Sequence, residues 1–294
     1  MSKILVTGAS GELGRETLHA LLETTDSSRL AAMVREPKKA SSLAEQGIEI
    51  RRGDYLDPSS LALAFAGIDK VLMVSAVAFT DRLAQHLNVI EAAKQAGVQH
   101  IVYTSIQRKP GSAHVIPMVT ESDQATEQAL ARSGLDYTVV RNSLYQEVLP
   151  FMLGSDWAAG GVHMTAGDGG AAMVSRKDLA LANALILTQP GHVGKTYTLG
   201  ASEVISFKEI ALTLSAITGR EVPYKIVSKH DFTTRLIAAG FPLAVADFLH
   251  EWVMAVNLGE FCEVTGDLEQ LIGRRPQSCQ DFLASHYHNM KTAG

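Results

Sequence analysis

Three glycines near the N-terminus, Gly8, Gly11 and Gly14, recur at intervals of three residues. Glycines in a strand-to-helix loop suit phosphate binding, because the backbone can approach the anion and the helix N-terminus supplies amide donors and a positive dipole. An apolar run over residues 3–7 precedes the loop, and a helical pattern over residues 12–23 follows it. This context favours a dinucleotide-binding loop over a glycine-rich turn without a ligand.

The three glycines have different expected roles. Gly8 permits the tight turn, Gly11 lets the backbone come close to a pyrophosphate, and Gly14 allows the helix to pack closely on the sheet. We expect the cofactor contacts of this segment to come from Gly8, Ser10, Gly11, Glu12, Leu13 and Gly14.

A basic residue, Arg35, follows the second apolar run at residues 30–34. Folds that bind NAD place an Asp or Glu about 20 residues after the loop, where it accepts from a ribose hydroxyl. The planar guanidinium of Arg35 instead suits a 2′-phosphate, and Lys38 and Lys39 add positive charge. The sequence therefore predicts NADP(H) over NAD(H) as the cofactor. The alternative is a solvated basic cluster that opens a surface helix.

Polar residues also follow other apolar runs of the first half. Asp54 comes after the run at residues 48–52 and could accept from an adenine amino group, although it could equally be a turn residue or a helix cap. Ser75, Ser105 and Asn142 fall at the carboxyl ends of three further runs. Ligands of open α/β sheets bind outside the carboxyl ends of the strands, so we count these three residues among the cofactor-binding candidates.

Short apolar runs and helical stretches must alternate to position these residues. The expected strands cover residues 3–7, 30–34, 48–52, 71–75, 101–105 and 137–141, and the expected helices cover residues 12–23, 58–66, 81–96 and 120–133. This alternation predicts an α/β protein with a Rossmann-type, doubly wound parallel sheet. The pattern breaks down after residue 149, which predicts a Rossmann domain at residues 1–148 and a smaller, mixed α/β portion at residues 149–294.

The composition excludes several function classes. The 294 residues are 46% hydrophobic and carry a formal net charge of −5, with no clustered basic face for nucleic acid. No stretch approaches the roughly 18 consecutive apolar residues of a membrane helix. Cys262 and Cys279 form no CxxC pair, and they match no usual zinc spacing with His286 and His288. We therefore expect no metal site and a cytoplasmic location.

Taken in order, these motifs resemble the NmrA-like branch of atypical short-chain dehydrogenases, closest to bacterial NAD(P)H:quinone oxidoreductases and triphenylmethane reductases. The resemblance runs nearly end to end, through residues 6–14, 34–35, 52–55, 96–98, 103–105, 137–142, 167–169, 267–268 and 271–274. It implies that the glycine loop and Arg35 bind NADPH. It further implies that Asn142 and Tyr145 lie at the floor of the active cleft, beside the nicotinamide.

The Tyr-x-x-x-Lys pair of conventional short-chain dehydrogenases is missing from residues 119–127. The only Tyr-x-x-x-Lys in the chain, Tyr287 to Lys291, is a chance match in the tail. By resemblance, Asp123 stands where quinone-reducing relatives often carry His or Lys. A quinone can take its protons from water, so positioning over the nicotinamide could supply most of the catalysis.

Two functions follow from this pattern. The first is an NADPH-dependent reductase that transfers hydride to quinones or similar flat conjugated acceptors. The second is a non-enzymatic, NADP(H)-binding redox sensor of the NmrA type, since nucleotide binding alone does not imply turnover.

Overall fold

The computed structural model describes residues 2–154, 156–167 and 169–287. The chain forms two compact units, each assembled from several segments. Unit 1 comprises Met1–Ile106, Met118–Asn142 and Arg176–Tyr197, and unit 2 comprises Gln107–Pro117, Ser143–Ser175 and Thr198–Gly294. The boundary between residues 148 and 149 that the sequence predicts stays a prediction.

Unit 1 is built on a seven-stranded sheet in the order β3-β2-β1-β4-β5-β6-β9. Its strands are β1 (Ile4–Val6), β2 (Leu30–Val34), β3 (Glu49–Arg52), β4 (Lys70–Met73), β5 (His100–Ile106), β6 (Asp136–Asn142) and β9 (Thr196–Leu199), the last of which begins in unit 1. Neighbouring strands from β3 to β6 pair in parallel. The strand order reverses at β1 and β4, as in a doubly wound Rossmann sheet, so the predicted fold class is confirmed.

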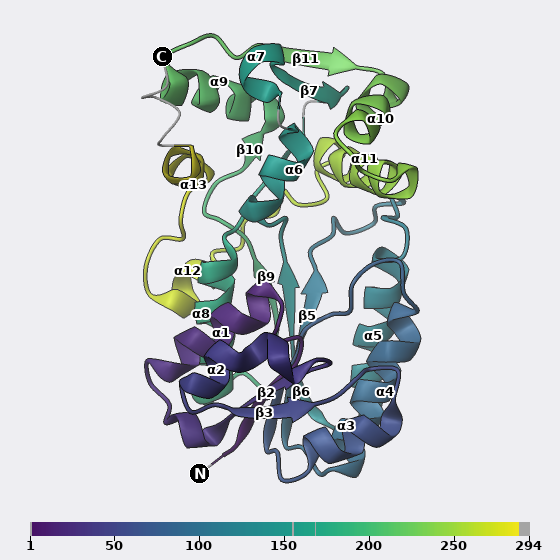
Figure 1. Cartoon of the computed structure of the whole chain (residues 1–294), viewed down its shortest axis with the longest axis vertical. Coiled ribbons are helices and arrows are strands. Elements are labelled where there is room, and N and C mark those ends of the chain that lie inside the picture. The colour runs from purple at the N-terminus through teal and green to yellow at the C-terminus, as the bar shows by residue number, and fades with distance from the viewer. Residues whose placement is uncertain (1, 155, 168, 288–294) are drawn as a thin grey trace. The chain divides into compact units, whose positions relative to one another are not determined.

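Helices cover both faces of this sheet (Figure 1). They are α1 (Glu12–Leu22), η1 (Ser27–Arg29), η2 (Pro37–Ala40), α2 (Ser41–Glu45), α3 (Pro58–Phe65), α4 (Arg82–Gln95), α5 (Thr120–Ser133) and α8 (Arg176–Thr188). Helix α1 packs on α8, while α3, α4 and α5 pack side by side.

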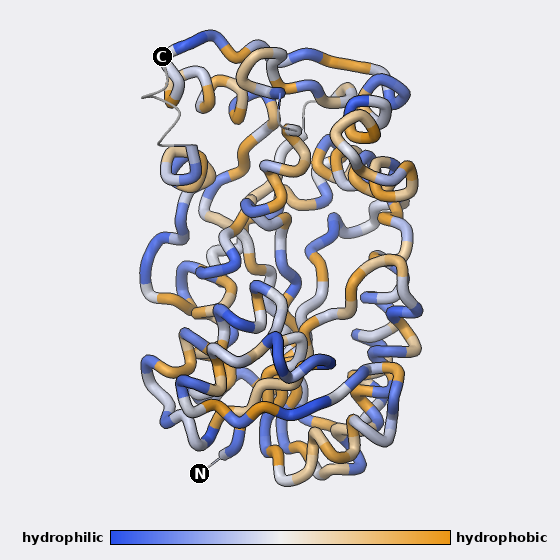
Figure 2. The backbone as a smooth tube through the Cα atoms, viewed as in Figure 1, coloured by the Kyte–Doolittle hydropathy of each residue, from blue (hydrophilic) through white to orange (hydrophobic). Residues whose placement is uncertain are grey.

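The central strands are buried on both faces, as parallel strands between two helical layers must be. Figure 2 shows the strand-rich centre of unit 1 in the hydrophobic part of the scale. One core cluster joins Leu5 and Tyr103 of the sheet to Phe65 of α3, Val89 of α4 and Leu130 of α5. This core leaves the carboxyl ends of the strands to form the site.

Unit 2 is a mixed α/β structure. Its elements are η3 (Gln146–Val148), α6 (Leu149–Leu153), α7 (Trp157–Gly160), β7 (Val162–Thr165), β8 (Gly170–Ala171), β10 (Ile205–Ser206), α9 (Phe207–Thr218), β11 (Tyr224–Val227), α10 (Lys229–Ala238), α11 (Leu243–Asn257), α12 (Asp267–Ile272) and α13 (Cys279–His286). Strands β7 and β11 pair in parallel, and β8 and β10 pair antiparallel. In the part of the chain that is described, no helix is long and apolar enough to cross a membrane.

Candidate dinucleotide site

The glycine loop connects β1 to α1 as predicted. Gly8 has a φ of +60°, a backbone conformation that L side chains rarely adopt. A Cβ at Gly14 would lie 2.7 Å from the carbonyl oxygen of Gly8. Gly14 thus lets α1 approach the loop itself, whereas the sequence predicted close packing on the sheet.

Helix α1 begins at Glu12 without a side-chain cap, because its N-cap residue is Gly11. The amides of the first turn of a helix have no intrahelical acceptor, so this end can bind an anion. The carboxylate of Glu12 pairs with Arg176 at 3.0 Å, and Leu13 is buried. Of the predicted contact residues in this segment, Glu12, Leu13 and Gly14 do not line the cavity described next.

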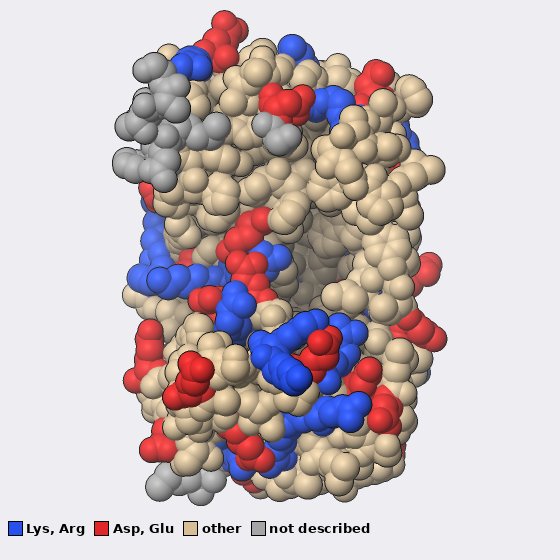
Figure 3. All heavy atoms as spheres, in the orientation of Figure 1, with Lys and Arg blue, Asp and Glu red and all other residues tan. Residues whose placement is uncertain are grey.

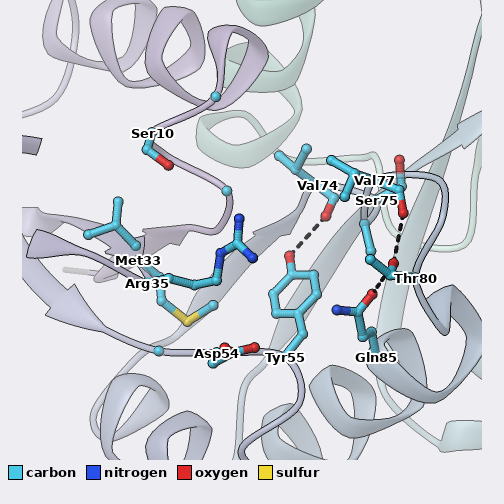
Figure 4. A pocket seen from close by; sticks show the side chains of 15 residues that line it. Ser10, Met33, Arg35, Asp54, Tyr55, Val74, Ser75, Val77, Thr80 and Gln85 are labelled. Atoms are coloured by element: carbon cyan, nitrogen blue, oxygen red, sulfur yellow. Dashed lines mark hydrogen bonds between the residues drawn. The ribbon is translucent and has the colours of Figure 1, made fainter. Parts of the chain in front are cut away.

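A cavity of about 250 Å³ lies at the carboxyl ends of β1 to β4 (Figure 4). Its lining residues are Gly8, Ser10, Gly11, Met33, Val34, Arg35, Gly53, Asp54, Tyr55, Val74, Ser75, Ala76, Val77, Thr80 and Gln85. The structure therefore brings together six predicted cofactor residues: Gly8, Ser10, Gly11, Arg35, Asp54 and Ser75. In a Rossmann sheet this region receives the adenosine half of a dinucleotide.

Arg35 extends from the end of β2, and its guanidinium points into the cavity in Figure 4. Among the described residues, no hydrogen bond or ion pair engages this guanidinium, so its donors are available to a ligand. Lys38 and Lys39 follow on η2, where Lys39 pairs with Glu36 at 2.7 Å. Figure 3 shows Lys and Arg side chains gathered on the surface over this segment. The local charge favours an anionic group beside Arg35.

Asp54 begins the turn after β3. Its Oδ1 accepts from the amide of Leu56 at 3.0 Å, which makes it a turn residue. The cap of α3 is instead Asp57, whose carboxylate accepts from the amides at the helix start. Because Asp54 also lines the cavity, its second carboxylate oxygen can accept from a ligand. The turn role and the adenine role that the sequence left open are therefore compatible.

Tyr55 forms the floor between β1 and β4, and the sequence predicted no role for it. Its hydroxyl donates to the carbonyl oxygen of Val74 at 2.8 Å and also contacts the hydroxyl of Thr7. Thr7 Oγ1 in turn accepts from the amide of Val74 at 3.0 Å. This network fixes the end of β4 against the glycine loop.

The rest of the cavity wall is the segment that follows β4. The amide of Ser75 donates to Thr104 Oγ1 at 2.9 Å. The hydroxyl of Thr80 lies 2.8 Å from the carbonyl oxygen of Val77 and 2.8 Å from the side-chain oxygen of Gln85 (Figure 4). Gln85 lines the cavity although it belongs to α4. The sequence offered one signal for this wall, the polar residue Ser75 at the end of an apolar run.

A family model of NmrA-like proteins matches residues 1–279. The chain belongs to the NmrA-like family. The predicted family is thereby confirmed.

The chain is similar to three proteins that are named as reductases. Quinone oxidoreductase 2 of Escherichia coli is 35% identical over 98% of this chain and 99% of its own length. The NAD(P)H azoreductase of Xenophilus azovorans is 28% identical over 96% of this chain and 97% of its own length. The Citrobacter triphenylmethane reductase, solved with NADP(H), matches with a TM-score of 0.90 and 36% identity, over 96% of this chain and 99% of that one. The solved NADPH complex of the Escherichia coli NADPH-dependent quinone oxidoreductase gives a TM-score of 0.91, at 34% identity over 97% and 99% of the two chains.

Three other predicted site residues of this NmrA-like chain lie away from the cavity lining. Ser105, near the end of β5, donates to Glu127 of α5 at 2.6 Å. Asn142 is the last residue of β6 and is buried. Tyr145 belongs to unit 2, where it is half-buried and bridges to Val174. The positioning roles of Asn142 and Tyr145 remain predictions.

Three residues that the sequence analysis covers fall outside the described residues: Asp168, His288 and Lys291. Tyr287, the partner of Lys291 in the tail motif, lies edge-on against Trp157 within unit 2 at a ring-centroid distance of 4.9 Å. Its environment is that of a packed aromatic residue.

Asp123 is not a surface acid. It is 2% exposed, and its carboxylate contacts Arg82 of α4 at 2.5 Å. Burial raises the pKa of Asp123, against the opposing effect of the Arg82 charge. A buried, paired carboxylate is a poor proton source for a substrate, which agrees with a mechanism based on positioning.

Proposed function

We propose that this NmrA-like protein is an NADPH-dependent reductase that transfers hydride to quinones or similar flat conjugated acceptors. One observation carries the proposal: the glycine loop, which includes the N-cap residue of α1, and the Arg35 guanidinium face one cavity. The relatives described above are quinone, azo-compound and triphenylmethane reductases, and they favour a reductase over a non-enzymatic regulator.

The lining residues fit NADP(H). The amides of Ala9 and Gly11 donate to Met33 and Gly8, so the amide of Ser10 and the open amides at the start of α1 would hold the pyrophosphate. Arg35 would hold the 2′-phosphate, and Asp54 would accept from the adenine amino group. The cradle is shaped for a backbone approach, since Gly8 and Gly11 line the cavity and bring no side chain into it. The bound cofactor would supply the hydride.

The protein's own part in the reaction is then to bind the cofactor and the acceptor and to orient them. No tyrosine–lysine pair stands on α5, so no side chain there can exchange a proton as in conventional short-chain dehydrogenases. Asn142 and Tyr145 are proposed to orient the nicotinamide and the acceptor, and water supplies the protons. A cytoplasmic location, predicted from the two isolated cysteines, stays a prediction.

Replacing Arg35 with alanine should change cofactor choice. The loss of a charge-assisted contact to the 2′-phosphate should weaken NADPH binding by about 1.5–3 kcal/mol, or about 10- to 150-fold in Kd. NADH lacks this phosphate, so its affinity should barely change. Calorimetric titration of wild-type protein and Arg35→Ala with both nucleotides measures the difference.

Lys38→Ala is the matched control, because Lys38 is an exposed cation of the same segment that does not line the cavity. It should lower NADPH affinity only slightly. Equal losses of NADPH and NADH affinity in Arg35→Ala would overturn the assignment of Arg35.

A further inference from the structure

The cavity wall after β4 is held by side chains of α4. Ala76, which lines the cavity, donates its backbone N–H to Nε2 of His86 at 2.9 Å. The carbonyl oxygen of Ala76 accepts from the guanidinium of Arg82. Both polar groups of one wall residue are therefore bound by side chains four residues apart on a single helix.

A second layer fixes those two side chains. Arg82 pairs with Oδ1 of Asp123 on α5, and the hydroxyl of Tyr103 on β5 donates to the same oxygen at 2.7 Å. Arg82, His86, Tyr103 and Asp123 are all at least nine-tenths buried. A buried ion pair is costly to break, so Arg82 has little freedom to leave Ala76.

The hydrogen bonds also determine the state of His86. Thr126 donates its hydroxyl to the carbonyl of Ser122 at 2.7 Å, so its oxygen accepts from Nδ1–H of His86 at 2.8 Å. Nε2 then keeps its lone pair for the amide of Ala76. Burial, followed by the Arg82 charge, lowers the pKa of His86 to about 3, which keeps the imidazole neutral near pH 7.

The wall needs such support because Ala76 lies beyond the end of β4, where the sheet supplies no backbone hydrogen bonds to it. The last pair between β4 and β5 joins Met73 and Tyr103, so Ala76 has no strand partner for its backbone. Phe79, three residues later, has a φ of +64°, which is uncommon for a residue other than glycine. Figure 4 shows Ser75 and Val77, the neighbours of Ala76, on the cavity wall.

We propose that Arg82, His86 and Asp123 are positioning residues that hold Ala76, and with it the wall after β4, in the conformation that binds the dinucleotide. This inference rests on the proposed function, because it assumes that NADPH occupies the cavity. The three residues act through Ala76 and do not themselves line the cavity.

His86 allows the sharpest test, since removal of Arg82 or Asp123 would leave a buried charge unpaired. His86→Leu keeps the bulk but loses the acceptor for Ala76, whereas His86→Gln places an amide oxygen near the position of Nε2. His100→Leu is the matched control. His100 is also buried and bonds a threonine, Thr138, at 2.8 Å, but it does not touch the cavity wall.

NADPH titration, thermal melting and steady-state kinetics with menadione should be run on the full chain. We expect His86→Leu to raise the Kd and KM for NADPH about tenfold, the effect of one lost hydrogen bond, with kcat at saturating NADPH changed less than about twofold. His86→Gln should restore binding to within about threefold of wild type. His100→Leu should lower the melting temperature without changing the Kd.

If wild-type protein binds NADPH, any of three outcomes would overturn the inference. These are unchanged NADPH affinity in folded His86→Leu, no recovery of affinity in His86→Gln, or an equal loss of affinity in His100→Leu. If His86→Leu does not fold, His86→Asn replaces it, because its shorter amide cannot reach Ala76 and the same loss is expected. Failure of wild-type protein to bind NADPH would instead refute the proposed function.

Discussion

Gly11→Val is expected to abolish NADPH binding while the fold survives. Gly11 lines the cavity with φ −81° and ψ 163°, a conformation open to any residue. A Cβ there would lie 3.2 Å from the carbonyl oxygen of Gly8, a contact that a small shift relieves. The branched side chain would nevertheless occupy the space through which a phosphate must approach the backbone. We expect a loss of about 100-fold or more in affinity.

Calorimetric titration with NADPH and a thermal melt of the same sample test this expectation together. Gly11→Ala should show a smaller loss, because a single methyl group fills less of the cavity. Gly14→Ala is the contrasting variant: its Cβ would meet backbone at 2.7 Å, so it should lower the melting temperature as well. Wild-type affinity in folded Gly11→Val would show that the loop is only a turn.

Asn142→Ala and Tyr145→Ala are expected to slow turnover on the order of 100-fold, the cost of a displacement of about 1 Å in the reacting groups. The cavity lined by β1 to β4 stays intact in both variants, since neither residue contributes to it. The loss should therefore appear mainly in kcat with saturating NADPH. Steady-state kinetics with one quinone measure it.

Tyr145→Phe separates the ring from the hydroxyl, and it should retain most activity if the ring only supports the acceptor. Tyr287→Phe is the tyrosine control from the same unit and should match wild type, since Tyr287 packs against Trp157. Near wild-type turnover in both alanine variants would contradict the positioning roles of Asn142 and Tyr145.

The strands and helices of unit 1 can be predicted from the sequence, because buried parallel strands appear in it as continuous apolar runs. The second expected strand coincides with β2 (Leu30–Val34), and the expected helix at residues 120–133 coincides with α5. The pairing of β7 with β11 could not be predicted in this way. These strands lie some 60 residues apart and are only partly apolar, so their partner is chosen by tertiary packing.

The candidate site, too, is predictable from the sequence only in part. Gly8, Gly11 and Arg35 carry their signal in residue type and spacing, and all three line the cavity. Arg82 and His86 carry no such signal, because a charged and a polar residue four positions apart on a helix usually mark a solvated face. Their inward-facing partners lie on another helix: Arg82 pairs with Asp123 and His86 bonds Thr126, and no local pattern identifies either contact.

The most direct test of the proposed reductase function is the oxidation of NADPH by the purified full chain in the presence of menadione or duroquinone, measured as the loss of reduced-nicotinamide absorbance. We expect steady oxidation over many turnovers that depends on the quinone, is faster with NADPH than with NADH, and is slower in Arg35→Ala at limiting NADPH. Tight NADPH binding without turnover of any quinone, azo dye or triphenylmethane dye would contradict it.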